Sequence, residues 1–97
     1  MRVKLHPAEE QDVEEAAAFY EREGAPLLAA KFVAEFKRLA ALLAEHPEIG
    51  SPRSKDRRGF SMSVFPYTVI YRVGPDEIKV LVVKHDRKRP GFGGKRA

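Results

Sequence analysis

The sequence predicts an α+β fold in the order β-α-α-β-β-β, with two antiparallel N-terminal helices covering one face of a small antiparallel sheet. The first half holds two stretches whose apolar residues recur at helical spacing. The second half holds stretches of alternating or β-branched residues, which are typical of strands. The length of the whole chain, 97 residues, predicts a single domain spanning 1–97, with a basic tail at 86–97. The boundaries between elements are marked by prolines 7, 26, 47, 66 and 75.

The first two elements are a short strand and an acidic helix. Residues 2–6 alternate, with Val3 and Leu5 against basic neighbours, which predicts a half-buried strand. Pro7 suits the first turn of a helix, because its missing N–H costs nothing there. The apolar stripe of that helix runs to about Arg22, and Gly24 stops it. The stripe is formed by Val13, Ala16, Ala17 and Tyr20.

Pro26 opens a second helix that ends near His46-Pro47. Its apolar residues also recur at helical spacing, which predicts a second buried stripe. Because the connection is short, the two helices are expected to be antiparallel. We expect their aromatic residues to belong to the core: Phe19, Tyr20, Phe32 and Phe36.

The rest of the chain predicts a loop followed by three strands. Residues 48–57 are polar and predict an exposed loop. Phe60, Met62 and Val64 alternate as the next strand, until Pro66 breaks the ladder. Residues 67–73 and 78–83 form two further strands joined by a turn at 74–77, so the three strands should make an antiparallel meander. The face of the sheet away from the helices should be partly open to solvent or to a partner.

Composition excludes several kinds of site. With no cysteine, the chain forms no disulfide and no thiolate metal site. His6, His46 and His85 are dispersed, so we expect no metal and no cofactor. The N-terminus lacks the apolar stretch of a signal peptide and no run is long enough to span a membrane, which predicts a cytoplasmic protein without membrane contact.

The charge is divided unequally along the chain. Residues 1–50 carry six basic and ten acidic side chains, and residues 51–97 carry twelve basic and four acidic, so balances of −4 and +8 give the net +4. The tail after the last strand adds basic residues around Gly91, Phe92 and Gly93. Such an asymmetry favours an anionic or acidic partner.

The whole chain resembles the RelE/ParE superfamily of toxins from bacterial toxin–antitoxin pairs. The resemblance depends on Leu5-His6-Pro7-Ala8 before the acidic helix, on Phe65-Pro66-Tyr67 followed by Ile70-Tyr71, and on the ending Val82-Val83-Lys84-His85. Further matching positions are Phe19, Tyr20, Phe32, Pro47, Gly50, Arg58, Arg87, Arg89 and Pro90, and the ending resembles the ParE-like branch.

This resemblance implies two helices on a curved antiparallel sheet, and an antitoxin that neutralises the protein by wrapping around it. Within the superfamily, RelE-like members cut messenger RNA in the ribosomal A site, whereas ParE-like members inhibit DNA gyrase. A toxin–antitoxin hetero-oligomer is then expected.

The residues argue against the nuclease. Metal-free RNA cleavage needs a base, an acid and cations for the phosphorane charge. The strand positions where RelE-like members place basic residues hold Gly59, Ser61, Ser63 and Thr68, and Phe92 stands where a tyrosine acid would serve. Weak catalytic candidates that survive this comparison are His85, Arg72, Arg58 and Arg89.

Several residues predicted to bind a target or an antitoxin also have a simpler interpretation. Arg53, Lys55, Arg57 and Arg58 form either a solvated loop or part of a surface for a partner. His85 is either an acid/base group or a hydrogen-bonded structural residue at a strand end. Arg72 either faces a partner or deters aggregation at an edge. Phe92 either fills a gap or anchors a partner. The predicted binding set is Arg58, Arg72, His85, Arg87, Lys88, Arg89 and Phe92.

Three functions therefore compete. The first is a ParE-like toxin that inhibits a protein, gyrase, and is neutralised by a cognate acidic antitoxin encoded beside it. The second is a ribosome-dependent mRNA endonuclease. The third is a small basic nucleic-acid-binding domain, disfavoured because neither helix is basic.

Overall fold

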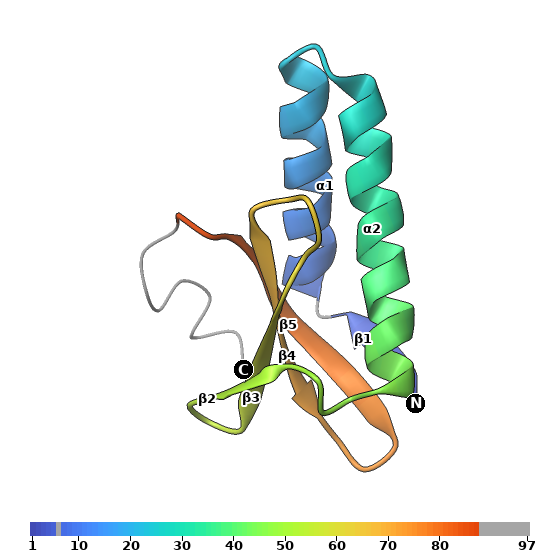
Figure 1. Ribbon diagram of the computed structural model, residues 1–97, viewed down its shortest axis with the longest axis vertical. Helices are drawn as coiled ribbons and strands as arrows, with labels where there is room; N and C mark the ends of the chain where they lie inside the picture. The colour runs from blue at the N-terminus through green and yellow to red at the C-terminus, as the bar shows by residue number, and fades with distance from the viewer. Residues whose placement is uncertain (6, 88–97) are drawn as a thin grey trace.

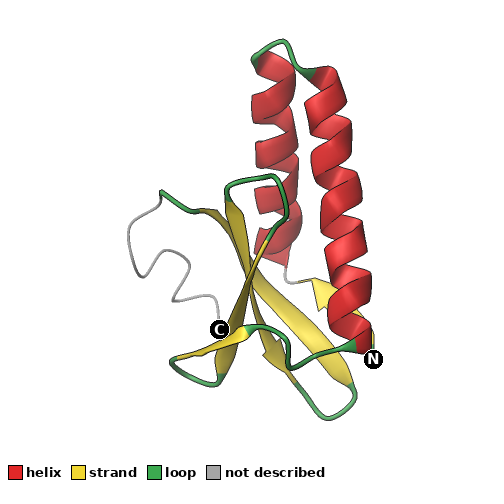
Figure 2. Ribbon diagram, viewed as in Figure 1, coloured by secondary structure: helices red, strands yellow, loops and turns green. Residues whose placement is uncertain are grey.

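Two helices form a hairpin beside a five-stranded sheet (Figure 1). The computed structural model describes residues 1–5 and 7–87. Figure 2 shows the hairpin rising past one end of the sheet, so part of each helix extends beyond the strands. In chain order, the elements are β1 (Arg2–Leu5), α1 (Pro7–Arg22), α2 (Pro26–Glu45), β2 (Ser51–Arg53), β3 (Arg57–Ser61), β4 (Tyr67–Val73) and β5 (Glu77–His85).

Both helices begin and end where the sequence predicts. Pro7 and Pro26 stand at the first helical positions, where a missing N–H is harmless. Gly24 adopts a φ of 76°, a left-handed conformation that reverses the chain between the helices. The N–H of His46 donates to the carbonyl of Leu42 and closes the last turn of α2.

The sheet order is β1-β5-β4-β3-β2. β3, β4 and β5 form the predicted antiparallel meander. β1, however, pairs with β5 in parallel, through Val3 opposite Ile78 and Leu5 opposite Val80, so the sheet is mixed. The expected α+β class and helix layer are confirmed, and the parallel pairing of β1 is a difference from the expected antiparallel sheet.

The strand boundaries differ from the prediction in several places. β3 begins at Arg57 and not at Phe60, and β5 extends from Glu77 to His85 beyond the predicted 78–83. The expected loop at 48–57 contains β2, a strand of three exposed residues that pairs with β3. The strand expected from Phe60 to Val64 ends at Ser61. Val64 lies in the connection to β4 with a φ of 75° and is 91% exposed, while its neighbour Phe65 is buried.

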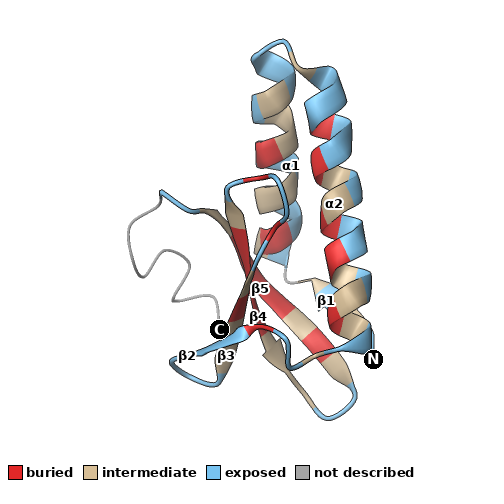
Figure 3. Ribbon diagram, viewed as in Figure 1, coloured by how far each residue is buried: buried red, intermediate tan, exposed pale blue. Residues whose placement is uncertain are grey.

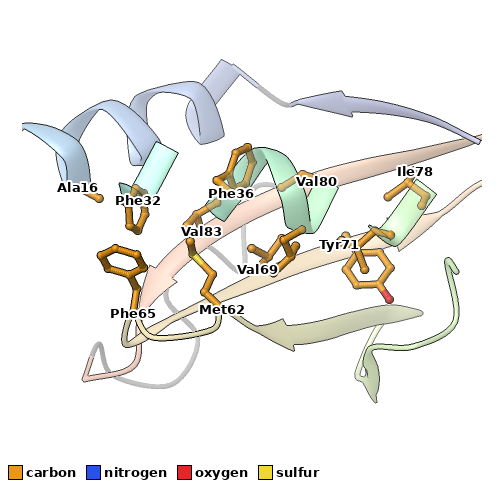
Figure 4. Packing of buried hydrophobic residues seen from close by; sticks show 12 residues of the cluster. Ala16, Phe32, Phe36, Met62, Phe65, Val69, Tyr71, Ile78, Val80 and Val83 are labelled. Carbon is orange, nitrogen blue, oxygen red and sulfur yellow. The ribbon is translucent and has the colours of Figure 1, made fainter. Parts of the chain in front are cut away.

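The core lies between the helices and the facing side of the sheet, as Figure 3 shows by the buried residues along α2, β4 and β5. Figure 4 shows Phe32 of α2 directed at Phe65, with Met62, Val69 and Tyr71 farther along the sheet. Phe36 also belongs to this cluster and Tyr20 packs against it, but Phe19 is 46% exposed, which corrects its assignment to the core. The buried members are Ala16, Phe32, Phe36, Leu39, Leu43, Met62, Phe65, Val69, Tyr71, Ile78, Val80 and Val83.

The opposite face of the sheet is less open than expected. Residues paired across antiparallel strands share a face, so Ile70 and its partner Val82 lie on the side away from the core residues Val69 and Tyr71. Both are nonetheless buried, as is Thr68. The centre of this face is therefore covered, and its charged residues are the parts that can meet a partner.

Replacing Val64 by glycine is expected to stabilise the protein. A left-handed conformation costs an L-residue about 1–2 kcal/mol, whereas glycine loses about 0.5–1 kcal/mol more entropy on folding. The expected net gain is about 0.5–1 kcal/mol, or a rise in Tm of about 4 °C, measured by thermal unfolding. Val64→Ala retains the strain and is the matched control. A glycine variant less stable than the wild type would contradict the expectation.

Candidate partner-binding surface

A row of cationic residues crosses the sheet on the face away from the helices. Lys4 of β1 lies opposite Lys79 of β5, which in turn lies opposite Arg72 of β4. Arg58 of β3 lies opposite Tyr71 of β4, so Arg57, one residue earlier on β3, lies beside Arg72. Arg57 is in turn paired with Arg53 of β2. The row therefore has one cation from each of the five strands. We call Lys4, Lys79, Arg72, Arg57 and Arg53 the basic row.

The basic row has little compensating charge around it. Glu77 lies near, but it pairs with Arg2 at 3.5 Å. The Asp86 carboxylate, at the other end of the same face, accepts a hydrogen bond of 2.7 Å from the Thr68 hydroxyl. Because like charges directly opposite one another destabilise a sheet, the basic row costs stability in the isolated protein. An anionic partner would relieve that repulsion.

Two members of the basic row are held in place by contacts with neighbouring strands and turns. Arg72 donates a hydrogen bond of 3.0 Å from its guanidinium to the carbonyl of Lys55. The side chain of Arg53 lies over Gly59, where a Cβ atom would meet its Nε. The absence of a side chain at Gly59 thus lets this arginine lie flat against β3, with its charge on the surface.

Arg58 lies on the opposite side of β3 from the basic row. It pairs with the core residue Tyr71, and its guanidinium donates to the carbonyls of Gly50 at 2.8 Å and Glu48 at 3.2 Å. Its hydrogen bonds therefore hold the segment that leads into β2. Arg58 shares no face with Arg72, although the two were predicted as members of one site.

His85 lies at the end of β5, far from Arg72. It is paired with Tyr67, five residues before Arg72 on β4, a separation of about 17 Å along a strand. Its ring stands edge-on to that of Tyr67 at 5.1 Å, and its Nδ1 accepts the backbone N–H of Arg87 at 3.1 Å. Arg58, Arg72 and His85 therefore do not converge on one reacting atom.

The remaining predicted residues fall partly outside the described chain. Arg87 is described and exposed. Lys88, Arg89 and Phe92 lie outside the described residues, and so does most of the basic tail at 86–97. Four members of the basic row lie outside the predicted binding set: Lys4, Arg53, Arg57 and Lys79. The period-two alternation of Lys4 and Lys79 with apolar neighbours was the available signal, but the alignment of the row depends on which strands pair.

A pocket of about 380 Å³ opens on the helix side, where β5 runs past the end of β1. The carboxylate of Asp12 on α1 accepts the backbone N–H of Val83 at 3.1 Å and so caps part of this sheet edge. Burial raises the pKa of the Tyr20 and Tyr67 hydroxyls above 10.0, so both are neutral at physiological pH. The pocket is lined by Asp12, Glu15, Ala16, Phe19, Tyr20, Arg22, Tyr67, Val83, Lys84 and His85.

Over residues 1–5 and 7–87, no group of three His, Asp or Glu side chains is placed to hold a metal ion. No helix in that part of the chain is long and apolar enough to cross a membrane.

The helical hairpin beside a mixed five-stranded sheet makes this an α+β domain. Among solved structures, the fold is similar to "Chromosomal ParDE TA system from P. aeruginosa", with a TM-score of 0.78 and 20% identity, over 88% of this chain and 95% of that one. The family model for the ParE toxin of the type II toxin–antitoxin system parDE matches residues 3–90. The chain belongs to this ParE toxin family. No curated protein matches it in sequence.

Proposed function

We propose that this ParE toxin inhibits a cellular protein, DNA gyrase, and is neutralised by a cognate acidic antitoxin that binds across the basic row. The observation that supports the proposal most strongly is the alignment of five cations across five strands. Such an alignment costs stability unless a partner neutralises it. A family whose name pairs toxin with antitoxin supplies a natural candidate for that partner.

An acidic segment that folds on binding suits this surface. Disordered acidic chains can wrap around a large surface, and they lose their conformational entropy only when they bind. The apolar centre of the face is already covered, because Ile70 and Val82 are buried. Charge complementarity should therefore contribute more to recognition here than apolar burial does, and the affinity should fall as salt rises.

Charge reversal in the basic row is expected to weaken antitoxin binding about 100-fold. Lys4 and Lys79 are paired in register, and a combined loss of about 3 kcal/mol for reversing both corresponds to that factor. The binding partner for the measurement is the product of the short reading frame expected beside this gene. The matched control is Lys31→Glu with Lys37→Glu on the exposed side of α2, measured by calorimetry at several salt concentrations. Equal losses in both double variants would reject the basic row as the binding surface.

The gyrase target is tested by adding the purified toxin to a supercoiling reaction. We expect supercoiling to fall with toxin concentration and to recover when the antitoxin is added. Undiminished supercoiling at a large molar excess of toxin would reject gyrase as the target. That result would not reject the antitoxin proposal, because the binding measurement tests the antitoxin separately.

The basic row also favours a second candidate, a ribosome-dependent mRNA endonuclease. A line of cations could track an RNA backbone. Against this candidate stands the separation of Arg58, Arg72 and His85. Primer extension on a translated message would show A-site cuts if the candidate were right, and such cutting should then be lost in His85→Ala with Arg72→Ala.

A further inference from the structure

The pocket between α1 and the end of β5 differs from the basic row in being largely aromatic. Four rings line it, from Phe19, Tyr20, Tyr67 and His85. Its volume of about 380 Å³ is that of a site for one side chain or a small ligand. Phe19 is a large aromatic residue with 46% of its surface exposed, although it lies on a helix whose other side faces the core.

Two carboxylates share one wall of this pocket. Asp12 and Glu15 are three residues apart on α1 and therefore neighbours on one face of the helix. Glu15 is exposed and accepts a hydrogen bond from Gln11 at 3.3 Å, which leaves most of its acceptor capacity for a ligand. Aromatic faces beside carboxylates are the surroundings that a cation prefers.

Two cations, Arg22 and Lys84, also line the pocket, so the formal charges of its two carboxylates are balanced. Arg22 lies seven residues beyond Glu15 on α1, about 10 Å along the helix axis. Lys84 is paired with Thr68 on β4. Over residues 1–5 and 7–87 neither cation is ion-paired with Glu15, so the Glu15 carboxylate is available to a ligand.

We propose that this pocket binds the side chain of an arginine from a partner protein. The flat guanidinium would stack on the ring of Phe19 and donate in its plane to the carboxylate of Glu15, a combination that a lysine ammonium does not offer. The toxin then has two different recognition elements. The basic row binds acidic residues of the partner. The pocket binds one arginine side chain and so determines which partner chains can bind. This inference does not depend on the partner being an antitoxin or gyrase.

The test uses acetyl-arginine-amide with the isolated protein, followed by backbone amide chemical shifts. About fifteen non-hydrogen atoms at about 0.3 kcal/mol each predict a Kd on the order of 1 mM. We expect shifts at Tyr67, Val83 and His85. Acetyl-citrulline-amide has the same shape without the charge and is expected to bind at least fivefold more weakly, and acetyl-glutamate-amide should not move these amides.

Two variants decide whether the pocket is responsible. Glu15→Gln and Phe19→Ala alter exposed residues, so both should fold, and each is expected to weaken the arginine probe about five- to tenfold. Glu14→Gln removes the same charge from a neighbouring exposed position that does not line the pocket, and it should change the Kd less than twofold. Equal binding of the citrulline or glutamate probe, or equal losses in Glu14→Gln and Glu15→Gln, would overturn the proposal.

Discussion

Gly50→Ala is expected to lower the free energy of unfolding by about 3 kcal/mol, which combines about 2 for overpacking with about 1 for a weakened hydrogen bond. A Cβ atom at this position would lie 2.5 Å from the Tyr71 hydroxyl oxygen and 3.0 Å from the backbone oxygen of Gly59. The hydroxyl has little room to move, because it accepts the N–H of Gly50 at 2.9 Å and donates to the carbonyl of Pro47 at 2.8 Å.

Thermal unfolding checks this expectation, since a loss of about 3 kcal/mol should lower the Tm of a domain of this size by about 15 °C. Ser51→Ala, at the next and exposed position, should shift it by no more than about 2 °C. Tyr71→Phe removes the atom nearest to the added Cβ. Its effect should therefore be clearly less than additive with Gly50→Ala. Strict additivity would show that Tyr71 is not what makes glycine necessary.

The second large effect is expected at Phe32, whose replacement by alanine should cost about 4 kcal/mol. Phe32 is completely buried on α2. Its ring centroid lies 4.9 Å from that of Tyr67 and 5.3 Å from that of Phe65, in edge-on arrangements that add to the burial. Because these contacts join the helical hairpin to the sheet, the cavity would open at the junction between the two layers.

Chemical denaturation followed by circular dichroism measures the loss at Phe32. A domain with a total stability of about 5–15 kcal/mol would lose between about a quarter and four fifths of it. Leu27→Ala is the matched control, because Leu27 lies on the same helix but is 78% exposed. It should change stability by less than about 0.5 kcal/mol. Similar losses in the two variants would mean that Phe32 does not join the layers.

The helices could be predicted closely because local signals define them. The prolines and Gly24 mark their ends, and the apolar spacing marks their buried sides. The pairing of β1 with β5 could not be predicted in the same way. A strand at the start of the chain pairs with a strand near its end, and no local feature of either segment indicates this pairing.

β2 and the end of β3 escaped prediction for a different reason. β2 consists of three exposed polar or proline residues, so it is stabilised by its hydrogen bonds to β3 and carries no apolar pattern. In the next segment, the alternation of Phe60, Met62 and Val64 suggested a continuing strand. The positive φ of Val64 instead reverses the chain and brings Phe65 into the core.

The candidate surface was predictable by residue type but not by arrangement. Arg72 could be assigned to the face away from Tyr71 by alternation alone, and the register confirms this assignment. The basic row requires the register of all five strands. Phe19 lies in the last turn of α1, and its exposure depends on the tertiary packing around that turn, which the sequence does not reveal.

The short strand β2 also has a consequence for the protein at high concentration. Pro52 cannot donate to a further strand, and all three residues of β2 are exposed. A second molecule that approached this edge would find a missing donor and the charge of Arg53, which disfavours continuous cross-molecular sheets. Overproduced toxin should therefore not extend its sheet into a second molecule through this edge.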